Sequence, residues 1–245
     1  GKENSGKYIL YFGANQSNKN NMLNIVNAKE AYNNFENSGI SKIDKNGDVK
    51  LYFNCPQPYN EKNNKNSETF YRHIHFCYSN SDNTKWDNNI YTKVIICNIS
   101  LNDTLKLSKN NQAIILNALP CEYYAKSHIP NSYNLPVKSA KNMNKNELHN
   151  WIKDIVELNY SKINDKINNN KINLYEVPIV VYCIHKNCDA AKNLAIELLK
   201  NGFVNLLYFK GGIEEYNKTK NKNRTRKNRT RKNRIRKNRR RKKRY

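Results

Sequence analysis

The sequence predicts a multidomain α+β protein: an N-terminal antiparallel β-sandwich over residues 1–104, an α/β domain with a parallel sheet over 105–217, and a disordered basic tail over 218–245. Three observations indicate this division. Short runs of β-branched and aromatic residues fill the first part, apolar strands alternate with helical patterns in the second, and Lys and Arg dominate the third. The 38% of apolar residues in the 245-residue chain are enough for two modest cores.

The first part contains several short segments of β type and no strong helix. A turn is expected at 44–48, Asp-Lys-Asn-Gly-Asp, and a short helical turn at 27–35. Strands at this spacing are typical of an antiparallel sandwich or barrel. The expected strands are 8–12, 49–53, 72–78 and 90–97.

Two histidines stand two positions apart on one of these expected strands. Side chains alternate between the faces of a strand, so His73 and His75 share a face, as two ligands of one metal ion must. A pair of polar surface residues is the alternative interpretation. With the neighbouring runs CPQPY (55–59) and IYT (90–92), the run HIHF (73–76) resembles the core of intradiol ring-cleavage dioxygenases over about residues 8–97.

That resemblance implies a non-haem ferric ion, Fe(III), with Tyr59, His73 and His75 as ligands. These enzymes have a second tyrosine ligand in the loop after the first strand. Asn20 stands at that position here, and Tyr32 is the nearest substitute. The implied ligand set is therefore incomplete in the sequence.

The same resemblance implies an active-site arginine three positions before the first histidine. This chain has Phe70 there, and the nearest arginine is Arg72, which is the expected substrate-binding residue. The fold alone, metal binding without catalysis, and ring-cleavage activity remain three separate possibilities.

In the second part, a cysteine follows an expected buried strand. The apolar run Pro178-Ile179-Val180-Val181 leads to Cys183, and a helical pattern begins at Asp189. A thiol beside a helix N-terminus faces backbone N–H groups and the positive end of the helix dipole, which favours a thiolate. A small core residue is the alternative interpretation of such a cysteine.

The order of motifs around this cysteine resembles the rhodanese family over about residues 105–217. An expected strand at 112–118 comes first, followed by HIPNSYNLP (128–136), VVYC (180–183), GFVNL (202–206) and GGIEEY (211–216). The resemblance implies a parallel sheet with Cys183 as the carrier of a sulfane sulfur, which it holds as a persulfide and passes to a nucleophile. No cofactor is required for that chemistry.

The loop after Cys183 narrows the expected chemistry. No arginine stands within ten residues after it, which disfavours the phosphatase-like branch of the family. Cys188 resembles the second cysteine of a longer-loop variant, able to resolve a persulfide or sulfenate on Cys183 as a disulfide. His185 is expected as an acid–base partner or as a solvated loop residue. The usual Asp-x-Arg after the upstream strand is Asn-Ala-Leu at 117–119, so catalytic competence is an open question.

The tail over 218–245 carries 18 of the 44 Lys and Arg and none of the 20 Asp and Glu. Its composition cannot form a core, and non-specific binding to nucleic-acid phosphates is its expected role. A nuclear-import signal and packing among acidic partners are alternatives, whereas a membrane tether lacks an apolar anchor. The arginines expected to contact phosphates are Arg224, Arg226, Arg229, Arg231, Arg234, Arg236, Arg239, Arg240 and Arg241.

Targeting features are weak. No signal segment opens the chain, no apolar run approaches the ~20 residues that span a bilayer, and the six cysteines show no secreted framework. A soluble protein in a reducing intracellular compartment, in the nucleus or inside a virion is expected. The excess of Asn and Lys indicates an AT-rich coding genome.

Three functions remain open at this point. The first is a rhodanese-like sulfurtransferase or thiol-redox protein acting through Cys183. The second is an iron-binding, dioxygenase-like protein. The third is a non-catalytic component that packages nucleic acid, for example in a virion.

Overall fold

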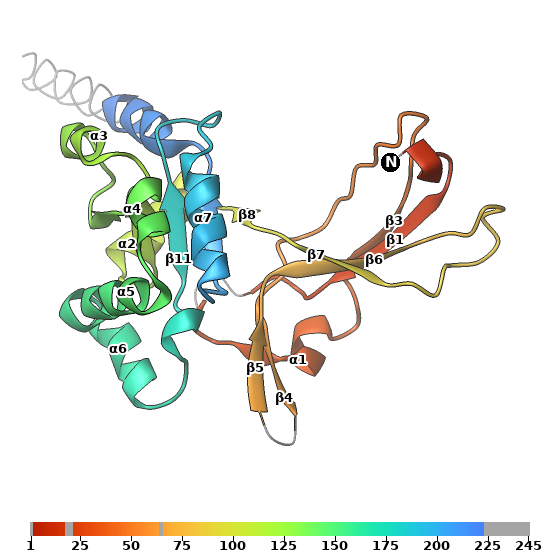
Figure 1. Cartoon of the computed structure of the whole chain (residues 1–245), viewed down its shortest axis with the longest axis horizontal. Coiled ribbons are helices and arrows are strands. Elements are labelled where there is room, and N and C mark those ends of the chain that lie inside the picture. The colour runs from red at the N-terminus through yellow and green to blue at the C-terminus, as the bar shows by residue number, and fades with distance from the viewer. Residues whose placement is uncertain (1, 18–21, 64–65, 223–245) are drawn as a thin grey trace, which may run out of the picture.

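The computed structural model describes residues 2–17, 22–63 and 66–222. An N-terminal part is built around an antiparallel sheet, and a C-terminal part around a parallel sheet covered by helices. The connecting chain crosses between them at β8 (Figure 1).

The N-terminal sheet has four strands in the order β3-β1-β6-β7, and every neighbouring pair is antiparallel. Alternate residues of the central strand β1 are buried, and Ile9 and Tyr11 form a small core with Ile43. The antiparallel sheet expected in this part is therefore present. Its strands are β1 (Tyr8–Gly13), β3 (Ser38–Lys42), β6 (His73–Tyr78) and β7 (Tyr91–Val94).

Residues 49–53 were expected to form a strand, and this prediction is wrong. Leu51 and Phe53 do pack against the small core. However, the hydroxyl of Tyr11 both accepts a hydrogen bond from the backbone N–H of Tyr52 and donates one to its carbonyl oxygen, each at 3.1 Å. These backbone groups are thus occupied by a side chain instead of a neighbouring strand.

A second, smaller sheet has the order β2-β4-β5. Helix α1 (Ala28–Tyr32) follows β2 directly, and Asn27 caps it by accepting a hydrogen bond from the N–H of Glu30 (2.9 Å). The finer expectation of a two-sheet sandwich stays a prediction. The strands are β2 (Val26–Asn27), β4 (Tyr59–Asn63) and β5 (Asn66–Phe70), and the short helix η1 (Lys2–Asn4) opens the described chain.

The C-terminal part confirms the expected parallel sheet. Its order is β10-β9-β11-β12-β8, and all neighbouring pairs are parallel. Strand β8, which precedes residue 104, already belongs to this sheet. The expected domain boundary after residue 104 falls inside helix α2. The strands are β8 (Cys97–Asn98), β9 (Ile114–Asn117), β10 (Ser132–Asn134), β11 (Ile179–Tyr182) and β12 (Leu206–Phe209).

Both faces of the parallel sheet are buried, as apolar strands of this class require. On β11, Ile179 and Val181 face one core, and Val180 and Tyr182 face the other. Helices α5 and α7 contribute buried residues to the first core, and α2 to the second. The helices are α2 (Leu101–Lys109), α3 (Cys121–Lys126), α4 (Val137–Asn142), α5 (Lys145–Asn159), α6 (Ser161–Asn168), η2 (Leu174–Glu176) and α7 (Ala190–Lys200). Residues 212–222 are also helical, so the prediction of disorder from residue 218 is wrong for 218–222, and the rest of that tail lies outside the described residues.

The two parts are joined by a disulfide between Cys55 and Cys97, 42 residues apart. The sequence gives no sign of this pair, because cysteines so far apart form no recognisable motif. Thr69 of β5 also hydrogen-bonds to Glu176 of η2, and the hydroxyl of Tyr71 donates to the carbonyl oxygen of Leu199. The N-terminal part is therefore docked onto the parallel-sheet domain.

No helix in the described ranges has the length and apolar content that a bilayer crossing requires.

Candidate functional site

Cys183 follows the last residue of β11 and opens the loop that leads to α7. All four residues of β11 are buried, which anchors the start of this loop. The backbone carbonyl of Cys183 accepts a hydrogen bond from the N–H of Ile213 (2.9 Å), so the loop is also tied to the segment after β12. This position is the carboxyl edge of the sheet, where open α/β sheets bind ligands.

Gly212 lies directly against the backbone of the cysteine loop. A Cβ atom there would lie 2.5 Å from the carbonyl oxygen of Cys183, and its φ of +60° is a conformation that favours glycine. The GGIEEY motif was visible in the sequence. Only the fold shows that its second glycine lets the chain pass this close to Cys183.

The side chains of Cys183 and Cys188 lie together in the loop. The thiol of Cys183 is completely buried and points at the carbonyl oxygens of Cys188 (3.2 Å) and His185 (3.6 Å). The side chain of Cys188 also lies close enough to affect the ionisation of Cys183. The loop is therefore arranged around a thiol pair.

This environment does not favour a thiolate. Burial and the hydrogen bond with Cys188 raise the pKa of Cys183 to about 12. Backbone hydrogen bonds at Ala191 and His185 lower this pKa, but by less. The sequence-based expectation of a lowered pKa is thus not met. The N–H of Ala191, in the first turn of α7, does favour the charged sulfur, but loss of solvent outweighs it.

His185 lies half-buried at the middle of the same loop. Its Nδ1 accepts a hydrogen bond from the backbone N–H of Asn187 (3.2 Å), which holds the ring within the loop. The role of His185 as an acid–base partner stays a prediction.

Amides replace the expected charged pair at the end of β9. The side-chain oxygen of buried Asn117 accepts a hydrogen bond from the N–H of Leu119 (2.8 Å), and Asn134 donates to the carbonyl oxygens of both residues. The chain turn next to the cysteine loop is thus held by neutral groups, which contribute no charge to the site.

A second cluster lies in the N-terminal part, where four ring side chains come together. Tyr32 comes from α1, Tyr59 from β4, and His73 and His75 from β6. The Nε2 atom of His73 lies 3.3 Å from the hydroxyl of Tyr32, 3.3 Å from that of Tyr59 and 3.1 Å from Nε2 of His75. The two hydroxyls are 3.5 Å apart. The three expected ligands and the substitute tyrosine therefore share one site.

The outer nitrogens of both imidazoles are engaged. Nδ1 of His73 lies 2.6 Å from the carbonyl oxygen of Tyr71, which only accepts, so this nitrogen carries the proton. Nδ1 of His75 lies 2.9 Å from the hydroxyl of Thr92. In a neutral His73, the lone pair of Nε2 therefore points into the cluster, as it does in metal-binding histidines.

Burial sets the protonation states of the cluster. It raises the pKa of the Tyr32 phenol, with a further increase from the hydrogen bond to Tyr59. It also raises the pKa of Tyr59, and it lowers the pKa of His75 with a contribution from the nearby His73. The uncharged forms of these groups are favoured in the absence of an ion.

The donor set fits a single hard cation. Bonds of about 2.1 Å to one ion separate neighbouring ligand atoms by about 3.0 Å in an octahedron and about 3.4 Å in a tetrahedron. The four separations of 3.1–3.5 Å lie close to these values. No group of three or more His, Cys, Asp or Glu side chains suited to a metal occurs in the described part of the chain, and here two of the donors are phenols.

Two other expected residues lie elsewhere or cannot be placed. Arg72 does not join the four rings; its guanidinium contacts Pro56 and Asn205 at the junction of the two parts. Asn20 and the tail arginines lie outside the described residues. The tail arginines in question are Arg224, Arg226, Arg229, Arg231, Arg234, Arg236, Arg239, Arg240 and Arg241.

Comparison with known proteins bears on the parallel-sheet domain. The family model of the rhodanese-like domain matches residues 100–219. No curated protein matches the chain.

Three solved structures illustrate the likeness. The BH2092 protein from Bacillus halodurans is 20% identical with a TM-score of 0.36, over 51% of this chain and 73% of its own. The Saccharomyces cerevisiae single-domain sulfurtransferase RDL2 is 14% identical with a TM-score of 0.37, over 53% and 94%. The human single-domain sulfurtransferase TSTD1 is 16% identical with a TM-score of 0.33, over 49% and 95%. The family match spans the strand, the cysteine loop and the glycine turn described above, and residues 100–219 of this chain are a rhodanese-like domain.

Proposed function

We propose that the protein is a sulfurtransferase-type thiol protein that carries a sulfane sulfur on Cys183. The observation that supports this most directly is the contact between the side chains of Cys183 and Cys188 in the loop after β11 of the rhodanese-like domain. A structural cysteine needs no second thiol beside it, whereas a sulfur carrier that is discharged by a neighbouring thiol does.

The proposed sulfur transfer has two steps. The Cys183 thiolate attacks the outer sulfur of a persulfide donor, the S–S bond of the donor breaks, and the donor leaves as a thiolate while Cys183 becomes a persulfide. The Cys188 thiolate then attacks Sγ of Cys183, a disulfide forms between the two residues, and hydrosulfide leaves. A dithiol reductant restores the starting state.

The raised pKa of Cys183 gives the loop a part in this mechanism. In the closed loop the thiol of Cys183 donates to the carbonyl oxygen of Cys188. That dipole opposes a negative sulfur, so we propose that the loop must turn this carbonyl away before the first step. Binding of the sulfur donor would displace the loop and so cause this movement.

Mass spectrometry tests this proposal. Fully reduced protein is treated with a sulfane-sulfur donor, and a +32 Da adduct on the peptide containing Cys183 is expected. The adduct should be absent in Cys183→Ser, and in Cys188→Ser it should accumulate because the resolving thiol is missing. Cys121→Ser is the matched control, since Cys121 is a free, exposed cysteine of the same domain. If neither the reduced wild-type protein nor Cys188→Ser forms the adduct, the proposal is wrong.

We propose iron binding as a second function, carried by the N-terminal part. The convergence of two phenols and two imidazoles supports it, because phenolate and imidazole are suitable ligands for Fe(III). Tyr32, Tyr59, His73 and His75 would hold the ion, and both phenols would lose their protons to it. A ferric ion supplies Lewis-acid and one-electron redox chemistry when bound.

The cluster of Tyr32, Tyr59, His73 and His75 lies beside a hollow that opens to solvent. A largely apolar hollow of about 510 Å³ is lined by Phe12, Phe35 and Ile90 as well as by Tyr32, Tyr59 and His75. An ion can therefore enter the cluster, and the aromatic walls would lower the local dielectric and strengthen its electrostatic interactions with the ligands.

Absorption spectroscopy tests iron binding without any activity measurement. After loading with ferric ion, the protein should gain a visible charge-transfer band and about one iron per chain. Tyr59→Phe and Tyr32→Phe should each shift or weaken the band, and Tyr123→Phe, a control at an exposed tyrosine, should leave it unchanged. Protein that stays colourless and takes up no iron would show that the cluster is only a packed aromatic group.

A further inference from the structure

Arg72 is a buried cation at the junction of the two parts of the molecule. It is 2% exposed, and its Nη1 donates to the carbonyl oxygen of Pro56 (2.7 Å) and, more weakly, to the sulfur of Cys55 (3.7 Å). Its Nη2 donates to the side-chain oxygen of Asn205 (2.5 Å). All three acceptors are neutral.

No carboxylate compensates this charge. None of the ion pairs between described residues involves Arg72, and the segments outside the described residues contain no Asp or Glu. An arginine guanidinium keeps its positive charge at neutral pH. A buried charge without a counter-ion destabilises the folded protein.

The guanidinium also has donors to spare. Of its five N–H groups, three have the partners named above, and Nε has no hydrogen-bond partner among the described residues. One N–H on Nε and one on Nη2 are left. Two adjacent donors of a guanidinium match the two oxygens of a carboxylate or phosphate.

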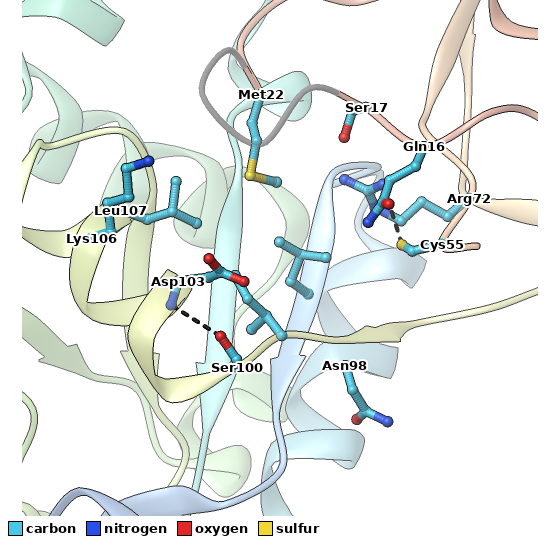
Figure 2. A pocket seen from close by; sticks show the side chains of 12 residues that line it. Gln16, Ser17, Met22, Cys55, Arg72, Asn98, Ser100, Asp103, Lys106 and Leu107 are labelled. Atoms are coloured by element: carbon cyan, nitrogen blue, oxygen red, sulfur yellow. Dashed lines mark hydrogen bonds between the residues drawn. The ribbon is translucent and has the colours of Figure 1, made fainter. Parts of the chain in front are cut away.

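Arg72 lines a pocket of about 160 Å³ between the N-terminal part and helix α2 (Figure 2). Figure 2 shows its side chain extending from the N-terminal part toward this hollow, on the same side as Gln16. Asp103 and Lys106 line the opposite wall from α2. The described lining residues thus include two cations and one anion, and Arg72 is the buried cation.

We propose that this pocket binds a small oxyanion, which the guanidinium of Arg72 holds and which supplies the missing counter-charge. The volume suits an ion of the size of phosphate or acetate. Met22, Leu107 and Leu207 add apolar side chains to the lining, so the ion would interact with the guanidinium at low dielectric. This site is separate from both the cysteine loop and the four-ring cluster.

Binding at this place would also strengthen the junction. The ion would contact Arg72, which already links the N-terminal part to Asn205, the residue just before β12. Asn205 in turn donates to the carbonyl oxygens of Met22 and Glu176. An anion that fixes Arg72 would thus stabilise contacts on both sides of the interface.

Thermal unfolding of the full-length protein tests the proposal. Inorganic phosphate and acetate are compared with chloride at equal ionic strength. At tenfold above its Kd, the binding anion should raise Tm by about 3–6 °C. Phosphate as the more effective ion would identify a tetrahedral ligand, and acetate a planar carboxylate.

Arg72→Met is the first variant, because it keeps the volume of the side chain and removes the charge. It retains the basic tail and the other surface cations, so any response to phosphate that it shares with wild type comes from those groups and not from Arg72. The difference in Tm shift between wild type and Arg72→Met measures anion binding in the pocket. It should account for nearly all of the Tm shift that the binding anion causes beyond chloride.

Gln16→Glu is a second variant that does not disturb the buried residue. It places a tethered carboxylate on the same side of the pocket as Arg72, so Tm should rise by about 2–4 °C without added anion and the response to phosphate or acetate should be lost. Asn34→Asp adds the same charge at an exposed position elsewhere and serves as the control. The proposal is overturned if neither anion exceeds chloride in wild type, or if Gln16→Glu behaves like Asn34→Asp.

Discussion

The buried thiol of Cys183 leads to a quantitative prediction about its reactivity. With a pKa of about 12, the thiolate fraction at pH 8 is about 10⁻⁴, whereas a thiol with the unperturbed pKa of 9.0 has about 10⁻¹. Alkylation proceeds through the thiolate. We therefore expect iodoacetamide to modify Cys183 in the folded protein roughly a thousandfold more slowly than in the same protein unfolded in urea.

The assay is time-resolved alkylation at pH 8, followed by mass spectrometry of the peptide that contains Cys183. Cys121 is the internal control, since it is exposed and should react at similar rates in both states. Cys188→Ala should accelerate the reaction of Cys183, because it removes the hydrogen bond that is the second cause of the raised pKa. A folded-state rate within tenfold of the unfolded rate would refute the closed, protonated loop.

The same shift predicts how stability depends on pH. The pKa of Cys183 is higher in the folded than in the unfolded protein, so its contribution is fully present below about pH 9 and is lost as the pH rises toward 12. Three pH units correspond to at most about 4 kcal/mol in the free energy of unfolding. Cys183→Ala should flatten the curve between pH 9 and 11 in urea titrations.

Three further predictions concern the rest of the chain. Reducing the Cys55–Cys97 disulfide should lower the free energy of unfolding by up to about 4 kcal/mol, as judged by urea titration with and without a reductant, because a loop of 42 residues is released in the unfolded chain. Cys97→Ser should show the same loss and no further effect of the reductant. Gly212→Ala should lower stability by about 1–3 kcal/mol and alter the alkylation rate of Cys183, since the new methyl group would press on the loop; unchanged values of both would show that the loop adapts freely. Deletion of 218–245 should abolish retention on duplex DNA, and in wild type the log affinity should fall by about nine units per tenfold rise in salt if about ten cations contact phosphates; retention by the truncated protein would assign binding to another surface.

The rhodanese-like half was predictable because its signals are local. The VVYC strand, the helix after it and the GGIEEY turn are contiguous segments, and each specifies its element by apolar pattern and glycine placement. The position of Cys183 at the carboxyl edge of a parallel sheet followed from them. Its pKa did not, because burial depends on what packs over the loop.

The N-terminal half was less predictable. The alternation of a strand was enough to place His73 and His75 on one face, and the resemblance added Tyr59. The resemblance placed Asn20 where the family has its second tyrosine and left Tyr32 as the nearest substitute, and only the packing of α1 against β4 brings Tyr32 into the site. The absent strand at 49–53 has a similar cause, since one tyrosine hydroxyl occupies its backbone groups.

The sequence by itself determined the class of each half, the order of the parallel-sheet motifs and the identity of the thiol pair, because strand and helix patterns and adjacent motifs are properties of neighbouring residues. The tertiary structure alone decided the disulfide between Cys55 and Cys97, the position of Arg72 at the junction and the protonated state of Cys183. Each of these depends on groups far apart in the chain and on the water that their packing excludes, and neither spacing nor composition encodes that contact directly.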